Sequence, residues 1–214
     1  MSRITVLGGT GYAGAAIAAE AQRRGHHVVA ISRTAPEQPE DGVEYVTGSA
    51  LDPAILDRVL DGSDVVIEAV SPRGDMAGKE EGLVDDLIAR VAGTPTRLGI
   101  IGGASSLLIE AGGPTLFDAH TPPPEVRPEV ETGMAILETL KQTADDVDWF
   151  YVSPPQEFGS WVPAPDTGRY RLGRDILLRD EDGRSVISAA DLARAVVDEI
   201  ESPAHRRARF TVAH

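Results

Sequence analysis

Three glycines at every third position, Gly8, Gly11 and Gly14, constrain the fold of this chain more than any other feature. They follow a short apolar run, Arg3–Leu7, whose β-branched residues are typical of a strand. They open an alanine-rich segment, Gly11–Arg24, that has helical periodicity. Glycine permits the tight backbone angles and close approaches of a strand-to-helix turn. The sequence therefore predicts a strand, a glycine turn and a helix at its start.

Apolar runs and helical segments then alternate along the chain. We expect further strands at 26–31, 43–46, 64–70, 97–101 and 148–152, and helices at 53–60, 76–92 and 129–143. Strands that are apolar on both faces and alternate with helices indicate a parallel sheet covered on both sides. The predicted fold class is α/β, with a doubly wound parallel sheet.

The composition of the sequence and its alternation of apolar runs with helical segments change after Ser153. Residues 154–168 are rich in proline and glycine, which predicts a loop, and two short strands are expected around the turn signal Asp182-Gly183. A helix at 189–201 and a strand at 208–212 are expected to follow. A second long loop is predicted at 104–127. In open α/β sheets, ligands bind in the loops that follow the carboxyl ends of strands.

The composition disfavours several classes of function. The formal net charge of −14 disfavours nucleic acid and anionic membranes as partners, because both require clustered cations. The absence of cysteine excludes disulfides and thiol chemistry. The start of the sequence lacks a basic leader, and no apolar run approaches membrane-spanning length. We expect a cytoplasmic protein, either a monomer or a homodimer.

The glycine turn predicts a site for a dinucleotide. Its glycines allow a pyrophosphate to approach the backbone, and the helix that follows offers free N–H groups and the positive end of its dipole. The hydroxyl of Thr10 can add a further hydrogen bond to a phosphate. The residues of the turn expected to bind the cofactor are Gly8, Thr10, Gly11, Tyr12, Ala13 and Gly14.

The residues at the end of the second strand predict which dinucleotide is preferred. An acidic residue there would suit the ribose 2′-hydroxyl of NAD, but this chain has Ser32-Arg33. A guanidinium can pair with the 2′-phosphate of NADP, although a solvated surface arginine is the alternative. Leu51 and Asp52 fall where an adenine edge could be met, and Asp52 is equally explained as a helix cap.

Other strand ends supply the remaining candidate residues. Further cofactor contacts are expected from Ala69, Val70, Ser71, Gly103 and Pro154. Ser105 is the candidate catalytic residue, because its hydroxyl could donate a hydrogen bond to the nicotinamide carboxamide or to a substrate carbonyl. The alternative is that Ser105 is an ordinary serine in a turn at the end of a strand. Substrate contacts are expected from Ser106, His120, Phe158 and Trp161, of which the two aromatic residues are equally suited to a hydrophobic core. No spacing predicts a metal site, and the acidic residues Asp75, Glu80, Glu81, Asp85 and Asp86 are expected to form a solvated face.

These motifs resemble the atypical short-chain dehydrogenase/reductase superfamily. The stretch GGTGYAG with Ser32-Arg33 is similar to that superfamily, and IIGGASSLL and the last 48 residues are similar to its NAD(P)H-binding, NmrA-like branch. That branch includes flavin, biliverdin and NADH-flavin reductases. The resemblance implies a Rossmann fold with strand order 3-2-1-4-5-6 in a single domain, residues 1–214. It also implies a small C-terminal substrate lobe, approximately residues 154–188 with 189–214.

The chain departs from the superfamily at its catalytic pair, a tyrosine followed four residues later by a lysine. Lys141 lies on the expected helix, but Leu137 stands where the tyrosine would be. This absence disfavours epimerase, dehydratase and alcohol dehydrogenase chemistry, and it agrees with the flavin reductase branch.

Two hypotheses remain for the function of this chain. The first is a reductase that uses NADPH, or NADH, to reduce a flavin, a quinone or a similar planar acceptor. The second is a non-catalytic NADP-binding redox sensor.

Overall fold

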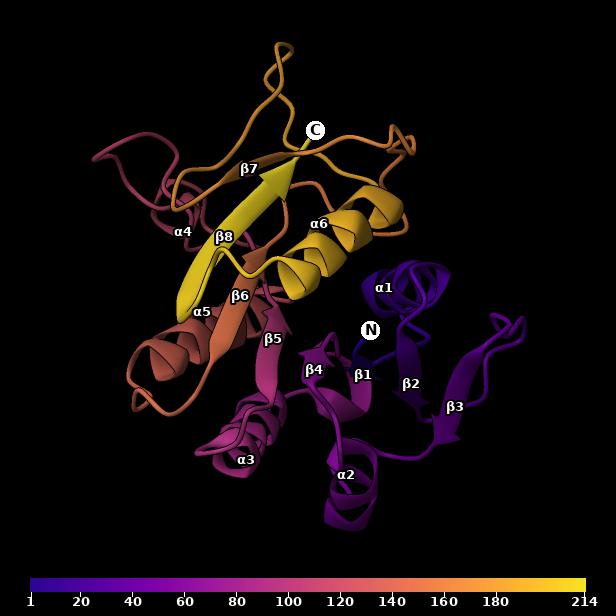
Figure 1. Ribbon diagram of the computed structural model, residues 1–214. Coiled ribbons are helices and arrows are strands. Elements are labelled where there is room, and N and C mark those ends of the chain that lie inside the picture. Colours follow the sequence, from indigo (N-terminus) through magenta and orange to yellow (C-terminus); the bar gives the residue numbers. More distant parts are fainter.

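One sheet of eight strands runs through the molecule, in the order β3-β2-β1-β4-β5-β6-β8-β7 (Figure 1). The computed structural model describes all residues from 1 to 214. The strands are β1 (Arg3–Leu7), β2 (His27–Ser32), β3 (Val43–Thr47), β4 (Val65–Glu68), β5 (Arg97–Ile101), β6 (Trp149–Ser153), β7 (Arg171–Gly173) and β8 (Ala208–Ala213). All neighbouring strands are parallel except β7, which pairs antiparallel with β8.

Helices cover both faces of the sheet. They are α1 (Tyr12–Arg23), α2 (Pro53–Leu60), α3 (Glu80–Val91), α4 (Leu116–Ala119), α5 (Arg127–Lys141) and α6 (Ala189–Glu201), with a short 3₁₀ turn η1 (Gly74–Met76). One core cluster joins α1 and α6 to the sheet, and a second joins α2, α3 and α5 to the opposite face (Figure 1). The doubly wound α/β prediction is confirmed.

The first six strands have the predicted order 3-2-1-4-5-6, and β8 and β7 extend the sheet beyond β6. The order reverses at β1, which pairs with β2 on one side and with β4 on the other. The crevice at the carboxyl ends of these strands is the place where open α/β sheets bind ligands.

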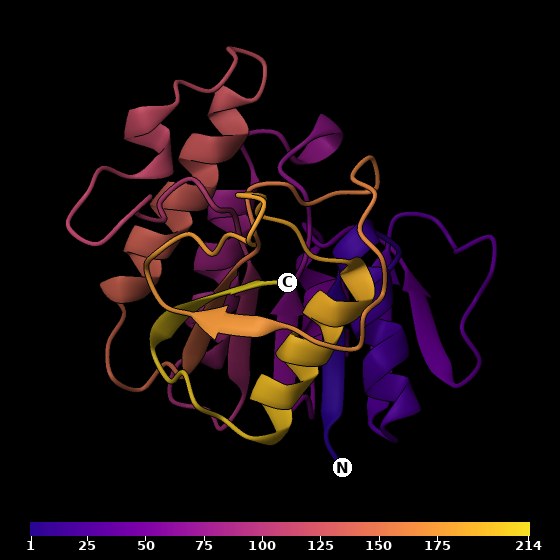
Figure 2. The ribbon, with the colours of Figure 1, turned by 90° about the horizontal axis from the view of Figure 1, so that it is seen from above.

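Helices from the two ends of the chain lie side by side, because α6 packs along α1 (Figures 1 and 2). Arg24, which follows α1, donates hydrogen bonds to Asp198 at 2.5 Å and to Glu201 at 2.7 Å, both on α6. No helix has the length and apolar character that a membrane crossing requires. A separate C-terminal substrate lobe stays a prediction.

The prediction that two short strands pair with each other around Asp182-Gly183 is wrong. The turn itself forms, with Gly183 at φ +78° and a hydrogen bond from Asp180 N–H to Arg184 O. The flanking segments pair elsewhere, since β7 lies along β8 and Val186 forms an isolated bridge with Glu157.

Candidate functional site

A cavity of about 1240 Å³ lies at the carboxyl ends of the parallel strands. The turn after β1 and the ends of β2 and β3 line one half of it. The loop after β4, the end of β5, the start of α5 and the loop after β6 line the other half. Sites for a drug-sized molecule usually occupy about 300–1,000 Å³. This cavity therefore has room for a large ligand or for two molecules together.

The glycine turn is packed so tightly that side chains are excluded from it. Gly8 has φ +79°, and a Cβ at this position would lie 2.6 Å from the carbonyl oxygen of Ala69. A Cβ at Gly14 would lie 2.3 Å from the carbonyl oxygen of Gly8. The start of α1 can therefore rest directly on the end of β1, which is the close helix–strand packing that the sequence predicts.

The same turn leaves a cluster of backbone donors free. The N–H groups of Thr10, Tyr12, Ala13 and Gly14 donate no hydrogen bond within the protein. Gly11 begins the helix without a side-chain cap. Unpaired N–H groups at a helix N-terminus bind anions, because the helix dipole adds a partial positive charge there. The turn therefore fits the pyrophosphate of a dinucleotide.

Arg33, which directly follows β2, also lines the glycine half of the cavity. Its guanidinium donates a hydrogen bond to the carboxylate of Asp75 at 2.6 Å, and both side chains are largely exposed. The Ser32 hydroxyl donates to the carbonyl of Thr34 at 2.6 Å. Arg33 thus supplies a positive charge to the glycine half of the cavity, and its guanidinium is paired with the Asp75 carboxylate.

Leu51 and Asp52 do not line the cavity. The Asp52 carboxylate accepts a hydrogen bond from Ala54 N–H at 2.9 Å and caps α2, so the helix-cap interpretation of Asp52 is confirmed. Contact of either residue with an adenine stays a prediction.

The cavity brings together most of the other predicted contact residues. Those on its wall are Gly8, Thr10, Gly11, Tyr12, Ala13, Ser32, Arg33, Ala69, Val70, Ser71, Gly103, Ser105, Ser106, His120, Pro154, Phe158 and Trp161, whereas Gly14 does not line it. Among these, Ser106 Oγ accepts from Arg209 at 2.6 Å, and the Phe158 ring packs at 5.1 Å from the Tyr12 ring. Trp161 is 67% exposed. These positions agree with the predicted roles, but a contact with a ligand stays a prediction.

Two buried carboxyl groups were not predicted at this site. Glu68, at the end of β4, is fully buried and accepts a hydrogen bond from Val70 N–H at 2.8 Å. Burial raises the pKa of its carboxyl well above the ordinary value. The only signal in the sequence is that Glu68 interrupts the apolar residues of the segment 65–70.

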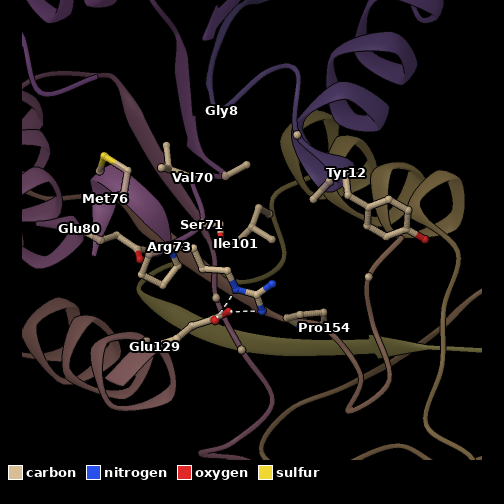
Figure 3. Close-up of a pocket in the computed structure, with 18 of the residues that line it drawn as sticks. Gly8, Tyr12, Val70, Ser71, Arg73, Met76, Glu80, Ile101, Glu129 and Pro154 are labelled. Atoms are coloured by element: carbon tan, nitrogen blue, oxygen red, sulfur yellow. Dashed lines mark hydrogen bonds and ion pairs between the residues drawn. The ribbon is translucent and has the colours of Figure 1, made fainter. Parts of the chain in front are cut away.

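Glu80 corrects the prediction of a solvated acidic face. It is only 4% exposed and lines the cavity, whereas Asp75, Glu81 and Asp85 are exposed. The first turn of α3 carries it inward, beside Met76 (Figure 3). Burial, with the nearby charges of Glu129 and Glu81, raises the pKa of the Glu80 carboxyl to about 8.

Tyr151 joins the far wall of the cavity to α5. Its hydroxyl donates to the carbonyl of Gly133 at 2.9 Å and accepts from Gly103 N–H at 3.2 Å. Burial raises the pKa of the phenol to about 12. With both hydrogen-bonding roles filled, this hydroxyl positions the end of β5 against α5.

Arg73 spans the cavity on the side of α5. Its guanidinium donates to both carboxylate oxygens of Glu129, at 2.6 and 3.0 Å (Figure 3). It also lies 5.6 Å from the centre of the Trp161 ring. It therefore connects the loop after β4 with α5 and with the loop after β6.

The side of α5 that faces the cavity carries no tyrosine–lysine pair. Glu129, Val130, Gly133 and Met134 line the cavity. Leu137 is buried in the core behind them. Lys141 lies in the last turn of the helix, and its ammonium donates to Glu138 at 2.7 Å.

Comparisons with known proteins agree with this geometry. A family described as NAD(P)H-binding matches residues 8–203. The chain is 35% identical to the protein YwnB of Bacillus subtilis, over 98% of this chain and 97% of that protein.

Solved structures show the same fold. A Streptococcus pneumoniae protein named as a candidate NADH-flavin reductase is 30% identical, with a TM-score of 0.88 and full coverage of both chains. A Bacteroides thetaiotaomicron protein named as a candidate epimerase is 31% identical, with a TM-score of 0.86, over 100% of this chain and 97% of that one.

Proposed function

The chain belongs to the NAD(P)H-binding family, and we propose that it is an NADPH-preferring oxidoreductase that transfers hydride to a flavin, a quinone or a similar planar acceptor. A nicotinamide cofactor supplies hydride chemistry, and the protein contributes binding, orientation and electrostatics. The observation that carries the proposal is the cluster of free N–H groups at the glycine turn, which opens into a cavity large enough for a second ligand.

The preference for NADPH rests on Arg33. Its guanidinium lines the glycine half of the cavity, and no carboxylate follows β2 at the position that would bind a ribose 2′-hydroxyl. A guanidinium pairs with phosphate through two parallel hydrogen bonds, and it interacts less strongly with a neutral hydroxyl. Residue Asp75 competes for the same guanidinium, so the preference depends on the 2′-phosphate displacing it.

The other half of the cavity suits a planar acceptor. Phe158 and the exposed Trp161 supply aromatic surface, and Ser105 supplies a hydroxyl at the end of β5. Alignment of two rings is the main requirement when the acceptor is already electrophilic. The name of the Streptococcus pneumoniae relative as a candidate NADH-flavin reductase supports a flavin as the first acceptor to test.

The alternative function is a redox sensor that binds NADP without turning it over. The absence of the tyrosine–lysine pair fits both functions, whereas the second half of the cavity favours a reductase, because a sensor needs no space for an acceptor. Epimerase chemistry, suggested by the name of the Bacteroides thetaiotaomicron relative, is not supported by the groups on the α5 side of the cavity.

The test is a panel of acceptors, FMN, FAD and several quinones, mixed anaerobically with the protein and NADPH or NADH. We expect protein-dependent loss of reduced nicotinamide absorbance with at least one acceptor, and a lower KM for NADPH than for NADH. Tight NADP binding without oxidation by any acceptor would support the sensor and refute the reductase.

A further inference from the structure

The far wall of the cavity holds an acidic group whose hydrogen-bonding capacity is unused. The side chain of Glu80 is buried, since the residue is only 4% exposed, yet its carboxyl makes no hydrogen bond and its Oε2 is enclosed without a partner. A buried carboxylate without a partner is strongly disfavoured, so such a group is held neutral or serves a ligand. Glu80 is one of the residues that line the cavity.

The charged groups around Glu80 favour its protonated form. Glu129 on α5 and Glu81 beside it on α3 are the acidic groups that raise its pKa, and the buried Glu68 neighbours it from β4. Arg73 neutralises Glu129 through two hydrogen bonds but makes none to Glu80 (Figure 3). The Tyr151 hydroxyl, from β6, is already saturated by backbone partners. The cation of this group, Arg73, is therefore engaged by Glu129 and does not pair with an ionised Glu80.

From this arrangement we infer that Glu80 is the proton donor that completes reduction of the acceptor. The inference deepens the proposed reductase function and rests on it. The acceptor gains a hydride as the C4–H bond of reduced nicotinamide breaks, so the acceptor is reduced and the nicotinamide is oxidised. As the hydride arrives, the O–H bond of Glu80 breaks in the same step, and its proton neutralises the negative charge that develops on an acceptor nitrogen or oxygen. Glu80 regains a proton from water once the product leaves.

Other groups near the cavity are less suited to this role. Glu68 does not line the cavity, and burial raises the pKa of its carboxyl well above the ordinary value, so it cannot reach an acceptor. Ser105 and Tyr151 are hydroxyl groups, and burial raises the pKa of Tyr151 to about 12. A general acid is most effective when its pKa lies near the working pH, and the pKa of about 8 for Glu80 satisfies that condition.

The experiment compares wild type with Glu80→Gln, Glu80→Asp and Asp85→Asn. Asp85 lies on the same helix, is exposed and makes no ion pair, so its substitution is the matched control for replacing a carboxyl by an amide. Single-turnover oxidation of NADPH by the best acceptor is followed from pH 6 to pH 10. The ionisation of Glu80 is measured separately, by ¹³C NMR of the side-chain carboxyl in the cofactor-free protein.

We expect a rate loss of about 10²–10⁴-fold in Glu80→Gln, the usual contribution of a general acid, with unchanged NADP affinity. The wild-type rate should fall as pH rises through about 8, in step with the NMR titration of Glu80. Glu80→Asp should restore part of the rate and the pH dependence, and Asp85→Asn should match wild type.

Different experimental results would overturn the role of Glu80 and the reductase function. A wild type that turns over, with a Glu80→Gln variant that is equally fast or keeps the same pH dependence, overturns the role of Glu80 alone. An ordinary carboxyl pKa for Glu80 by NMR also overturns it. A wild type that binds NADP but reduces no acceptor overturns the reductase function and this inference with it.

Discussion

At the scale of single residues, Arg33 is the group through which we propose that this acidic protein binds the 2′-phosphate of NADP. The net charge of −14 repels anions at long range, so binding must depend on local groups. Arg33 supplies such a group, but Asp75 occupies it at 2.6 Å. Because both side chains are largely exposed, this ion pair is weak, and a phosphate with more charge can displace the carboxylate.

Replacing Arg33→Ala should weaken NADP binding by about 1–3 kcal/mol, the scale of a lost charged hydrogen bond, and barely change NAD binding. Isothermal titration calorimetry with both dinucleotides measures this. Arg58→Ala, an exposed position on α2 outside the cavity, is the control and should leave both affinities unchanged. Equal losses for both dinucleotides would show that Arg33 does not meet the 2′-phosphate.

Replacing Asp75→Asn should tighten NADP binding, since the guanidinium loses its competing anion while the side chain keeps its shape. NAD binding should change little. Competitive titration of the two dinucleotides against wild type and variant gives the ratio. A weaker affinity for NADP in the variant would contradict competition, because it would mean that Asp75 helps to position Arg33.

Glu80 shows the limit of sequence reasoning at this scale. In the sequence it belongs to a group of acidic residues of which Asp75, Glu81 and Asp85 are exposed. Its burial depends on the angle at which α3 begins, and a 3₁₀ turn and Gly78, at φ +69°, determine that angle. Local composition cannot predict a tertiary angle, whereas the glycine turn could be predicted because its chemistry is contained within seven adjacent residues.

At the scale of elements, the strand–turn–helix unit of β1 and α1 is the part that a cofactor depends on most. Its glycines are required by contact with other backbone atoms, because a Cβ at Gly8 or at Gly14 would lie within 2.6 Å of a carbonyl oxygen. This contact explains why small residues occur there irrespective of helix propensity.

Gly14→Ala should remove dinucleotide binding and lower stability by about 1–3 kcal/mol, the usual cost of overpacking. Thermal unfolding and calorimetry measure the two effects. Gly82→Ala is the matched control, because a Cβ there meets nothing within 4 Å on the exposed side of α3. It should raise stability by up to about 1 kcal/mol through helix propensity. Equal behaviour of the two variants would show that close packing does not require glycine at position 14.

Most elements could be predicted because their signals are local. The cap of Asp52 before Pro53 fixes the start of α2, and the apolar run of residues 97–101 is β5 as expected. The region after Ser153 was predicted less well. There β7 pairs with β8, which is distant in the sequence, instead of with a neighbouring strand in a hairpin. Which of these two pairings forms depends on the tertiary structure of the whole sheet.

At the scale of the whole molecule, two buried carboxyl groups affect stability against pH. The pKa of Glu80 is raised to about 8, and that of Glu68 is raised well above its ordinary 4.5. The folded state therefore binds more protons than the unfolded state above pH 4.5. It follows that these groups lower the free energy of unfolding as pH rises from about 4.5 toward 8.

Glu68→Gln should remove part of this dependence, because an amide cannot ionise. Denaturant unfolding of wild type and variant from about pH 4.5 to pH 8 gives the difference in free energy at each pH. The variant should gain stability relative to wild type as pH rises. A difference that stays constant across this range would show that Glu68 has the same pKa in both states.

The cavity, as we propose, holds reduced nicotinamide in one orientation against an acceptor. This orientation is tested most directly with NADPH that carries deuterium at either the pro-R or the pro-S position of nicotinamide C4, in anaerobic single-turnover oxidation by FMN or the best quinone. We predict a slower reaction with one of the two deuterated cofactors only, since a fixed ring presents one face to the acceptor. Equal slowing with both, or oxidation at the rate seen without protein, would contradict a fixed orientation.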